Sequence, residues 1–297
     1  MKPEASCQGK GIFLTRNFDW LQAGEHYVAQ RYLHKPYLID KLKFDLRIYV
    51  LVTGMNPLRA YIYHEGLARF ATEEYVSPLG SNLGDLCMHL TNYAINKDSE
   101  DFIFNEDPNK DDVGHKRSLR AVFEYIDSHR TGPKDKTGKQ IWADIKDVIV
   151  KTLITGHPHI SHLYRTSKPE DLENSLCFQI LGFDIFIDSK SKAWLLEVNQ
   201  SPSFTTDTPL DFNIKKNLIS DAINILNLNW KRKNKYIQQK RLEQQKRVLV
   251  GKQKMNLDEK EMIREKKMKV KDKFEQANLG GYEMLYPLKR GVAPEDD

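Results

Sequence analysis

The chain lacks the features that mark several common protein classes. No apolar run in its 297 residues is long enough to cross a bilayer, so we expect no association with a membrane. The first residues, MKPEASCQGKG, have no apolar core of the kind that signal peptides carry, so nothing indicates secretion. Three cysteines, Cys7, Cys87 and Cys177, are too few and too far apart for a disulfide framework or a zinc motif, and they fit a reducing compartment.

Two widespread catalytic signatures are also missing. The sequence contains no GxxxxGK[ST], which excludes a P-loop, and no set of Ser, His and Asp or of Cys and His that would form a nucleophilic site. The histidines of HPHISH (157–162) raise the possibility of zinc. Their spacing, the intervening Pro158 and the absence of a nearby cysteine or acid pair favour a surface loop instead.

Charge is unevenly placed along the chain. The whole sequence has 46 Lys and Arg against 41 Asp and Glu, a net charge of +5, but residues 231–275 alone hold 17 Lys and Arg against 7 Asp and Glu. This pattern predicts a basic appendage on a slightly acidic body, and such an appendage binds polyanions. The segment has neither interleaved aromatic residues nor a recognition motif, so an acidic protein surface is favoured over nucleic acid.

Alternation of polar and apolar residues predicts strands early in the chain. In LKFDLRIYVLVT (42–53), Lys43, Asp45 and Arg47 share one face and the other face is apolar. This stripe fits either a solvated edge or a phosphate channel in which Asp45 holds the two bases apart. Residues 59–72, RAYIYHEGLARFAT, predict two more strands joined at Glu65–Gly66, with Arg69 on the second.

Helical periodicity dominates the second half. Helices are predicted near 118–129, from Ile141 to Thr155 and over Leu210–Leu228, where the apolar residues form one face. The basic segment is almost free of Gly and Pro and predicts one long or two shorter helices. Residues 278–297 are expected to form a loosely ordered tail.

Leu176–Phe204 predicts a β-hairpin with chemistry on one face. If Asp188 pairs with Ala193, Asp184 lies directly opposite Glu197. Two like charges facing each other on a sheet are unfavourable unless a cation lies between them. Asn199 adds a neutral oxygen on the same face, and three oxygen ligands suit Mg²⁺. The alternative is a solvated face with acids placed there by chance.

Three other segments carry weaker signals. Gly9 and Gly11 bracket Lys10 in a loop that suits an anion, although a tight turn explains it equally well. Residues 30–33, QRYL, fit an adenine pocket or plain core packing. The run HLTNYAINK (89–97) offers hydroxyl, amide and ammonium groups where a buried strand end would be apolar.

Several long motifs together resemble one family, the tubulin tyrosine ligase-like proteins. They occur in the family's order over about residues 1–228: KPEASCQGKGIF, QRYL, KFDLRIYVLVTG, EGLARFAT, LTNYAINK, HLYRT, GFDIFID and WLLEVNQSPSFTTD. The LTNYAINK and EVN-SPSF forms, followed by a basic helical segment, resemble the polyglutamylase branch. These are ATP-grasp ligases that add glutamate to glutamate side chains in tubulin's acidic C-terminal tails.

The resemblance implies a fold and a domain plan. The fold would be α/β (α+β), with the central and C-terminal ATP-grasp domains forming a mixed, antiparallel-rich sheet flanked by helices and followed by a basic helical extension. Residues 1–228 would be the catalytic core, 229–277 a microtubule-binding segment and 278–297 a flexible tail. The family has an N-terminal domain before its KP loop, so the sequence is expected to be a fragment or a shortened gene model.

The resemblance also implies roles for individual residues. The metal ligands for Mg²⁺ would be Asp184, Glu197 and Asn199. Catalysis and the carboxylates of glutamate and acceptor would involve Arg47, Arg69, Tyr93, Lys97 and Lys215. The ATP contacts would be Lys2, Lys10, Gly11, Gln30, Arg31, Tyr32, Leu33, Lys43, Phe44, Asp45, Thr91 and Asn92.

The expected partners are microtubules and free L-glutamate, and the expected location is the cytoplasm and cytoskeleton, with the cilium or basal body as a candidate site. We expect a monomer. Two alternatives stay open: a catalytically inactive microtubule-binding module, and a related ligase that adds glycine or tyrosine. Arg69 and Lys97, which suit a second carboxylate, favour glutamate over glycine.

Overall fold

The computed structural model describes residues 1–4, 9–19, 24, 26–169, 171–250 and 256–288. It divides into two compact units, each built from three segments of the chain. The first unit comprises Met1–Tyr49, Glu65–Thr152 and Leu181–Ile214, and the second comprises Val50–His64, Leu153–Ile180 and Lys215–Asp297. The predicted division at residues 228 and 277 stays a prediction.

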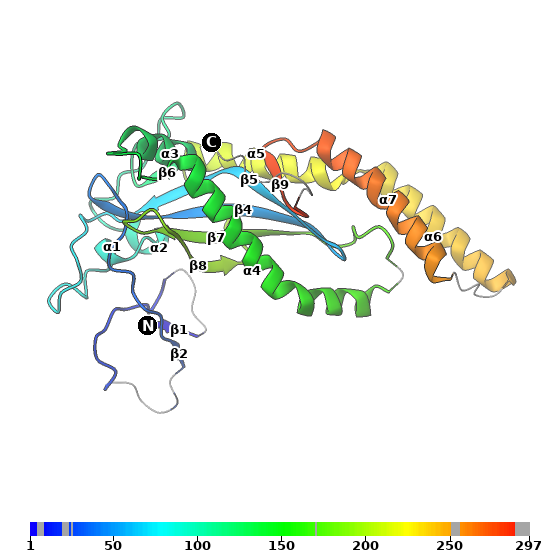
Figure 1. Ribbon diagram of the computed structural model, residues 1–297, viewed down its shortest axis with the longest axis horizontal. Coiled ribbons are helices and arrows are strands. Elements are labelled where there is room, and N and C mark those ends of the chain that lie inside the picture. Colours follow the sequence, from blue (N-terminus) through cyan, green and yellow to red (C-terminus); the bar gives the residue numbers. More distant parts are fainter. Residues whose placement is uncertain (5–8, 20–23, 25, 170, 251–255, 289–297) are drawn as a thin grey trace. The chain divides into compact units, whose positions relative to one another are not determined.

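The expected mixed α+β architecture is confirmed, because helices flank a large sheet with the strand order β6-β5-β4-β7-β8 (Figure 1). Two further strands join this sheet, β3 beside β4 and β9 beside β5, while β1 and β2 pair separately. The strands are β1 Lys2–Pro3, β2 Tyr27–Val28, β3 Leu38–Ile39, β4 Leu42–Met55, β5 Leu58–Phe70, β6 Lys116–Ser118, β7 Gln179–Ile187, β8 Ala193–Asn199 and β9 Tyr282–Tyr286. The helices are α1 Leu86–His89, α2 Tyr93–Asn96, α3 Leu119–Ser128, α4 Gly138–Ser167, α5 Pro209–Leu226, α6 Trp230–Val250 and α7 Leu257–Ala277.

Strand β5 is continuous, so the predicted break at Glu65–Gly66 is wrong. A Cβ at Gly66 would lie 2.3 Å from the backbone oxygen of Arg47, so this glycine permits close approach of neighbouring backbones instead of making a turn. The Glu65 carboxylate accepts the N–H groups of Gly66, at 2.9 Å, and Leu119, at 2.8 Å. Glu65 therefore satisfies a backbone donor at the start of α3.

The predicted helix near 118–129 is confirmed as α3. Its Ser118 cap accepts the N–H of Ala121 at 2.9 Å, and its buried residues Leu119, Val122 and Ile126 follow helical spacing. The helix predicted over 141–155 is longer than expected, since α4 continues to Ser167.

HPHISH lies within α4, so the predicted surface loop is wrong. Pro158 removes one backbone N–H from the helix but does not end it. A ring nitrogen of the preceding His157 is 2.8 Å from the carbonyl oxygen of Met55, a contact within the second unit that holds the helix beside the end of β4. Tertiary contacts have therefore outweighed a local helix breaker.

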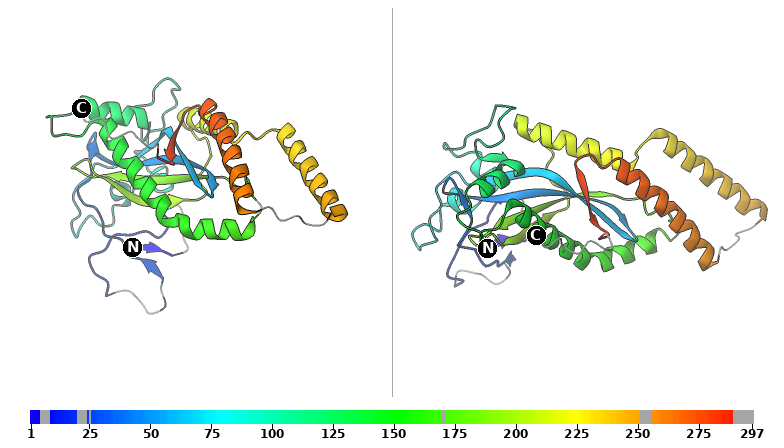
Figure 2. Two further views of the ribbon diagram at one scale, coloured as in Figure 1. Left: turned by 45° about the vertical axis from the view of Figure 1, so that its right-hand side comes forward. Right: turned by 45° about the horizontal axis from the view of Figure 1, so that its top comes forward.

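The basic segment forms two helices, which is one of the two arrangements predicted for it, one long helix or two shorter ones. Side chains of α6 are almost all exposed, whereas α7 is fixed within the second unit by its last turns. Glu275 is 1% exposed and accepts hydrogen bonds from Arg59 and, at 2.7 Å, from the Tyr61 hydroxyl. Lys271 donates to the carbonyl oxygens of Thr53, at 3.1 Å, and Asn174, at 2.6 Å. Figure 2 shows α6 and α7, in yellow and orange, as two separate rods.

The expected loosely ordered tail contains a strand. Strand β9 pairs antiparallel with β5, and its Tyr282 and Leu285 are buried. The Tyr282 hydroxyl donates to the carbonyl oxygen of Leu218 at 3.2 Å, which ties β9 to α5 within the second unit. Among the residues that the structure describes, no helix combines the length and the apolar character needed to cross a membrane.

Candidate functional site

A cavity of about 1170 Å³ lies within the first unit. Polar residues of β4, β5, β7 and β8 form one side of it, and the segments 1–2, 12–18, 29–35, 77–83 and 89–92 contribute the rest. Six lining residues are Lys or Arg and four are Asp or Glu. The basic residues suit an anionic ligand, and the acidic residues suit a metal cation bound together with it. Twelve predicted site residues line it: Lys2, Gln30, Arg31, Tyr32, Leu33, Lys43, Asp45, Arg69, Thr91, Asn92, Asp184 and Glu197.

Lys43 is the most deeply buried cation of the cavity. Its ammonium donates to the His89 carbonyl oxygen at 2.6 Å and to the Tyr32 hydroxyl at 3.2 Å, and it lies 4.5 Å from the centre of the Tyr32 ring. Burial lowers the pKa of Lys43 to about 8, although the neighbouring Asp45 acts in the opposite direction. An anionic ligand would favour the charged form of this lysine.

Two arginines hold Asp184, which is 2% exposed. Arg47 donates through Nε and Nη2 to the two carboxylate oxygens, at 2.5 and 3.1 Å, and Arg69 Nη2 lies 2.8 Å from Oδ2. Arg69 also forms two hydrogen bonds with Asp45. Burial alone would raise the pKa of Asp184, but the charges of Arg69 and Arg47 lower it. Asp184 is therefore a fixed anion at the cavity wall.

Asp184 and Glu197 are direct cross-strand partners, as predicted, but the strand register near the turn differs from the predicted one. Ile187, not Asp188, pairs with Ala193. Ile185 then pairs with Leu195 before the register shifts by one residue. Leu196 is the extra residue of a β-bulge. The bulge reverses which face of the sheet each side chain of β8 after Leu196 points to. Without the bulge, Leu196 would lie opposite Asp184 and Glu197 would point away from it.

A cation fits between the two facing acids. Partial burial and the neighbouring Asp184 carboxylate raise the pKa of Glu197. Asn199 Nδ2 donates to both acids, at 3.1 Å to Glu197 and 3.5 Å to Asp184, and so takes the bridging position that a cation would take. Rotating the amide would present its oxygen, giving two carboxylates and one carbonyl, a donor set that suits Mg²⁺. Among the residues that the structure describes, no group of three or more His, Cys, Asp and Glu could hold a metal ion, so a cation here would depend on two acids and one amide.

Several predicted site residues do not line the cavity. Phe44 is 1% exposed and stacks on Phe70 in the core, because its side chain alternates with those of Lys43 and Asp45 along β4, so only its backbone is available to a ligand. Arg47 reaches the site only through Asp184. The other residues outside the lining are Lys10, Gly11, Tyr93, Lys97, Asn199 and Lys215, the last of which belongs to the second unit.

Tyr93 belongs to a separate polar cluster of the first unit. Lys116, which is 6% exposed, lies 3.6 Å from the centre of the Tyr93 ring and 2.7 Å from the carboxylate of Asp211. Burial and the nearby Asp207 raise the pKa of Tyr93 to about 12. A buried lysine beside a phenol is a further candidate contact for a substrate carboxylate.

Among the lining residues that were not predicted as site residues, three bear on the chemistry of the cavity. Phe186 shares a strand face with Asp184, and the alternation that places it there was visible in the sequence but was not interpreted as a binding contact. Trp194 lines the cavity and donates from its indole N–H to Asp188 at 2.9 Å. His89 is fully buried and lies 3.0 Å from the Tyr32 hydroxyl; no local pattern marks it, because its partner is far away in the sequence.

Comparison with known proteins gives a consistent result. The model of the tubulin-tyrosine ligase family matches residues 1–235. A probable beta-tubulin polyglutamylase of Tetrahymena thermophila is 51% identical over 290 residues, covering 97% of this chain and 24% of the relative. Tubulin polyglutamylase TTLL6 of Homo sapiens is 46% identical over 286 residues (96% and 31%), and TTLL13 of Mus musculus is 44% identical over 290 residues (96% and 35%). The chain thus spans about a quarter to a third of the length of these curated relatives.

Proposed function

The chain belongs to the tubulin-tyrosine ligase family, and from this premise we propose that it is the catalytic part of a ligase that joins glutamate to glutamate side chains of tubulin's C-terminal tails. The observation that carries the proposal is the convergence of Lys43, Arg69, Asp184 and Glu197 on one cavity of the first unit. Amide formation between two carboxylate-bearing reactants needs an activated acyl group, and a site of this kind can hold the phosphates that provide one.

Lys43 and Lys2 would hold the phosphates of ATP. Lys43 is the better placed of the two, because it is buried and already oriented by the His89 carbonyl and the Tyr32 hydroxyl. Gln30, Tyr32 and Leu33, together with the apolar residues Phe186 and Leu196, would enclose the base. When bound, ATP supplies the phosphoryl group that activates the acceptor γ-carboxylate as an acylphosphate.

Asp184, Glu197 and Asn199 would hold Mg²⁺, which neutralises phosphate charge. Arg47 would act as a positioning residue, because it fixes the Asp184 carboxylate without reaching the cavity. Arg69 lines the cavity and would orient a substrate carboxylate through its planar guanidinium group. No nucleophilic side chain is needed, because the amine of free glutamate would attack the acylphosphate carbonyl, form the amide bond and release inorganic phosphate.

The basic helices would bring the enzyme to its substrate. The exposed cations of α6, among them Lys240 and Arg241, suit an acidic microtubule surface. A tubulin-modifying ligase would act at the cytoskeleton, with the cilium or basal body as a candidate site. The cytoskeletal location and the glutamate donor follow from the proposed chemistry.

ATP-dependent transfer of labelled glutamate to microtubules tests the proposal. Glu197→Gln should abolish transfer while leaving thermal unfolding unchanged, because it removes a metal ligand that extends into the cavity. The matched control is Glu243→Gln, which removes an exposed acid of α6 and should keep transfer at the unmodified level. Full activity of Glu197→Gln would refute the metal assignment.

A further inference from the structure

A second pocket lies within the second unit and shares no lining residue with the cavity of the first unit. Its volume is about 730 Å³, and it is lined by the end of α4, the residues that follow that helix, the turn between β4 and β5, and the first half of α7. All of these segments belong to one compact unit. A volume of this size accommodates a few residues of a peptide.

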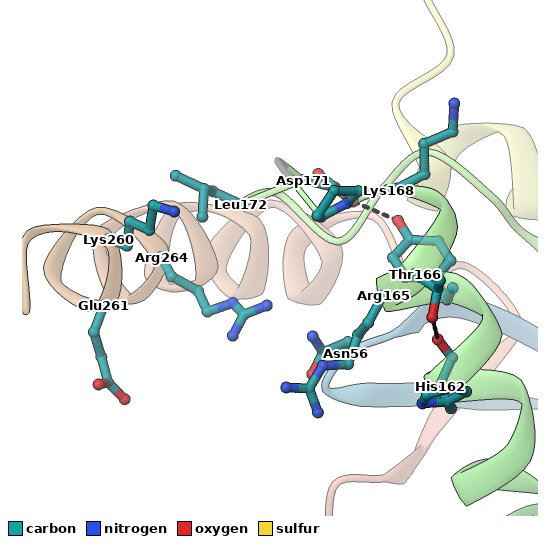
Figure 3. Close-up of a pocket in the computed structure, with 12 residues that line it drawn as sticks. Asn56, His162, Arg165, Thr166, Lys168, Asp171, Leu172, Lys260, Glu261 and Arg264 are labelled. Carbon is teal, nitrogen blue, oxygen red and sulfur yellow. Dashed lines mark hydrogen bonds between the residues drawn. The ribbon is translucent and has the colours of Figure 1, made fainter. Parts of the chain in front are cut away.

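The pocket has a surplus of unpaired positive charge. Arg165, Lys168, Lys260 and Arg264 line it, and none of them forms an ion pair with another residue that the structure describes. Two acids also line the pocket. The Asp171 carboxylate is already used, because it accepts the Tyr164 hydroxyl and the N–H groups of Glu173 at 2.9 Å and Asn174 at 3.2 Å. Glu261 is exposed on α7, and in Figure 3 its carboxylate points away from Arg264. Four cations against one free acid leave the pocket with a surplus of positive charge.

Arg264 points to the missing partner most directly. Its Nε–H is buried and has no hydrogen-bond acceptor among the described residues. In Figure 3 the Arg264 guanidinium extends from α7 toward Arg165 and the side chain of Asn56. A buried donor without an acceptor is unfavourable, and two guanidinium groups that face one pocket repel each other. An anion between them would relieve both costs.

The rigidity of this arrangement supports a binding role. Helix α7 carries Arg264 and is fixed by buried Glu275 and by Lys271, and the β4–β5 turn that carries Asn56 is held by Asn174, which accepts the N–H of Asn56 at 2.9 Å. The two sides of the pocket are thus positioned before any ligand arrives, which lowers the entropic cost of binding.

We propose that this pocket binds an acidic peptide segment, with Arg165 and Arg264 each holding a glutamate carboxylate and Asn56 pairing with the peptide backbone. The choice of a glutamate-rich peptide rests on the proposed function, which supplies such a substrate. Guanidinium groups bind carboxylates through two parallel hydrogen bonds. A nucleic acid fits less well, because only two aromatic rings, His162 and Tyr164, line the pocket for base stacking, and the Tyr164 hydroxyl is bonded to Asp171.

Fluorescence anisotropy with a labelled oligoglutamate peptide and the 297-residue chain tests the proposal. Arg165→Gln and Arg264→Gln should each weaken binding about tenfold, because each removes a charge-assisted pair. Arg264→Lys should recover only part of this loss, since lysine keeps the positive charge but cannot form the two parallel hydrogen bonds of a guanidinium group. The matched control is Arg130→Gln, which removes the same charge from an exposed position with no assigned role and should change binding less than about twofold.

Three results would overturn the proposal: unchanged binding in both pocket variants, an equal loss in Arg130→Gln, or displacement of the peptide by an RNA oligonucleotide at lower concentration than by unlabelled oligoglutamate. If Arg264→Gln unfolds, the exposed Arg165 carries the same test. Peptide binding requires no nucleotide, so the two proposals fail separately. Absent glutamate transfer with pocket-dependent peptide binding refutes only the ligase, and the reverse result refutes only the pocket.

Discussion

Burial of Lys43 makes nucleotide affinity depend on pH in a predictable way. With a pKa of about 8, this lysine is charged in roughly 90% of ligand-free molecules at pH 7 and in roughly 9% at pH 9. Phosphates favour the charged form, so binding at pH 9 must first protonate the amine. The Kd for ATP should therefore rise about tenfold between pH 7 and pH 9, equivalent to about 1.4 kcal/mol.

Calorimetric titration with ATP and Mg²⁺ at constant ionic strength measures this profile. Lys43→Met should bind weakly and show a flat profile, because the titrating group is gone. Lys41→Met is the matched control: Lys41 lies two residues away on the surface, paired with Glu74 at 3.2 Å, and its removal should leave the slope unchanged. A flat profile in the unmodified protein, or the same slope in Lys43→Met, would refute the reasoning.

The same pKa predicts the opposite trend for stability without nucleotide. The unfolded chain has an ordinary lysine pKa of about 10.4, so between pH 8 and that value it binds more protons than the folded chain. The free energy of unfolding should therefore rise with pH in this window. Lys271, whose pKa burial also lowers to about 8, contributes with the same sign in the second unit. Affinity and stability thus change in opposite directions above pH 8.

Two further predictions concern packing. Glu275→Ala should destabilise the second unit by about 2–3 kcal/mol, because Arg59 then keeps only the half-exposed Asp272 as its acidic partner. Denaturant unfolding measures this, and a loss below about 1 kcal/mol would contradict the anchoring role of α7. Gly182→Ala should displace Arg47 from Asp184, because the added Cβ would lie 2.9 Å from Pro202 and 3.2 Å from the Arg47 side chain. The free energy of unfolding should fall by about 1–3 kcal/mol, with a matching loss of nucleotide affinity. Unchanged affinity would show that Arg47 does not position Asp184.

The strands and the acidic pair could be predicted because their signals are local. Alternation placed Lys43 and Asp45 on one face of β4, and both line the cavity. The Asp184–Glu197 pairing was predicted correctly from an incorrect starting pair. Ala193 pairs with Ile187 instead of Asp188, and the extra residue Leu196 compensates for this one-residue difference. A bulge of this kind depends on how both strands pack, so the sequence around Leu196 does not mark it.

Features that depend on distant partners could not be predicted. Helix α4 continues through Pro158 where His157 contacts Met55, about a hundred positions earlier in the chain. The glycine at position 66 has the local appearance of a turn, but it is required by the Arg47 backbone of the neighbouring strand. The fixed position of α7 depends on Arg59 and Tyr61, which the charge pattern of a basic segment does not reveal.

Mass spectrometry of tubulin tails tests the central claim most directly. Microtubules would be incubated with ATP, Mg²⁺ and the 297-residue chain, in parallel with glutamate, glycine or tyrosine, and with Glu197→Gln as the inactive control. The account predicts mass increments of glutamyl residues on tail glutamates, present only with ATP and glutamate and absent in the variant. Increments with glycine or tyrosine in place of glutamate, or the same glutamyl increments in Glu197→Gln, would contradict it.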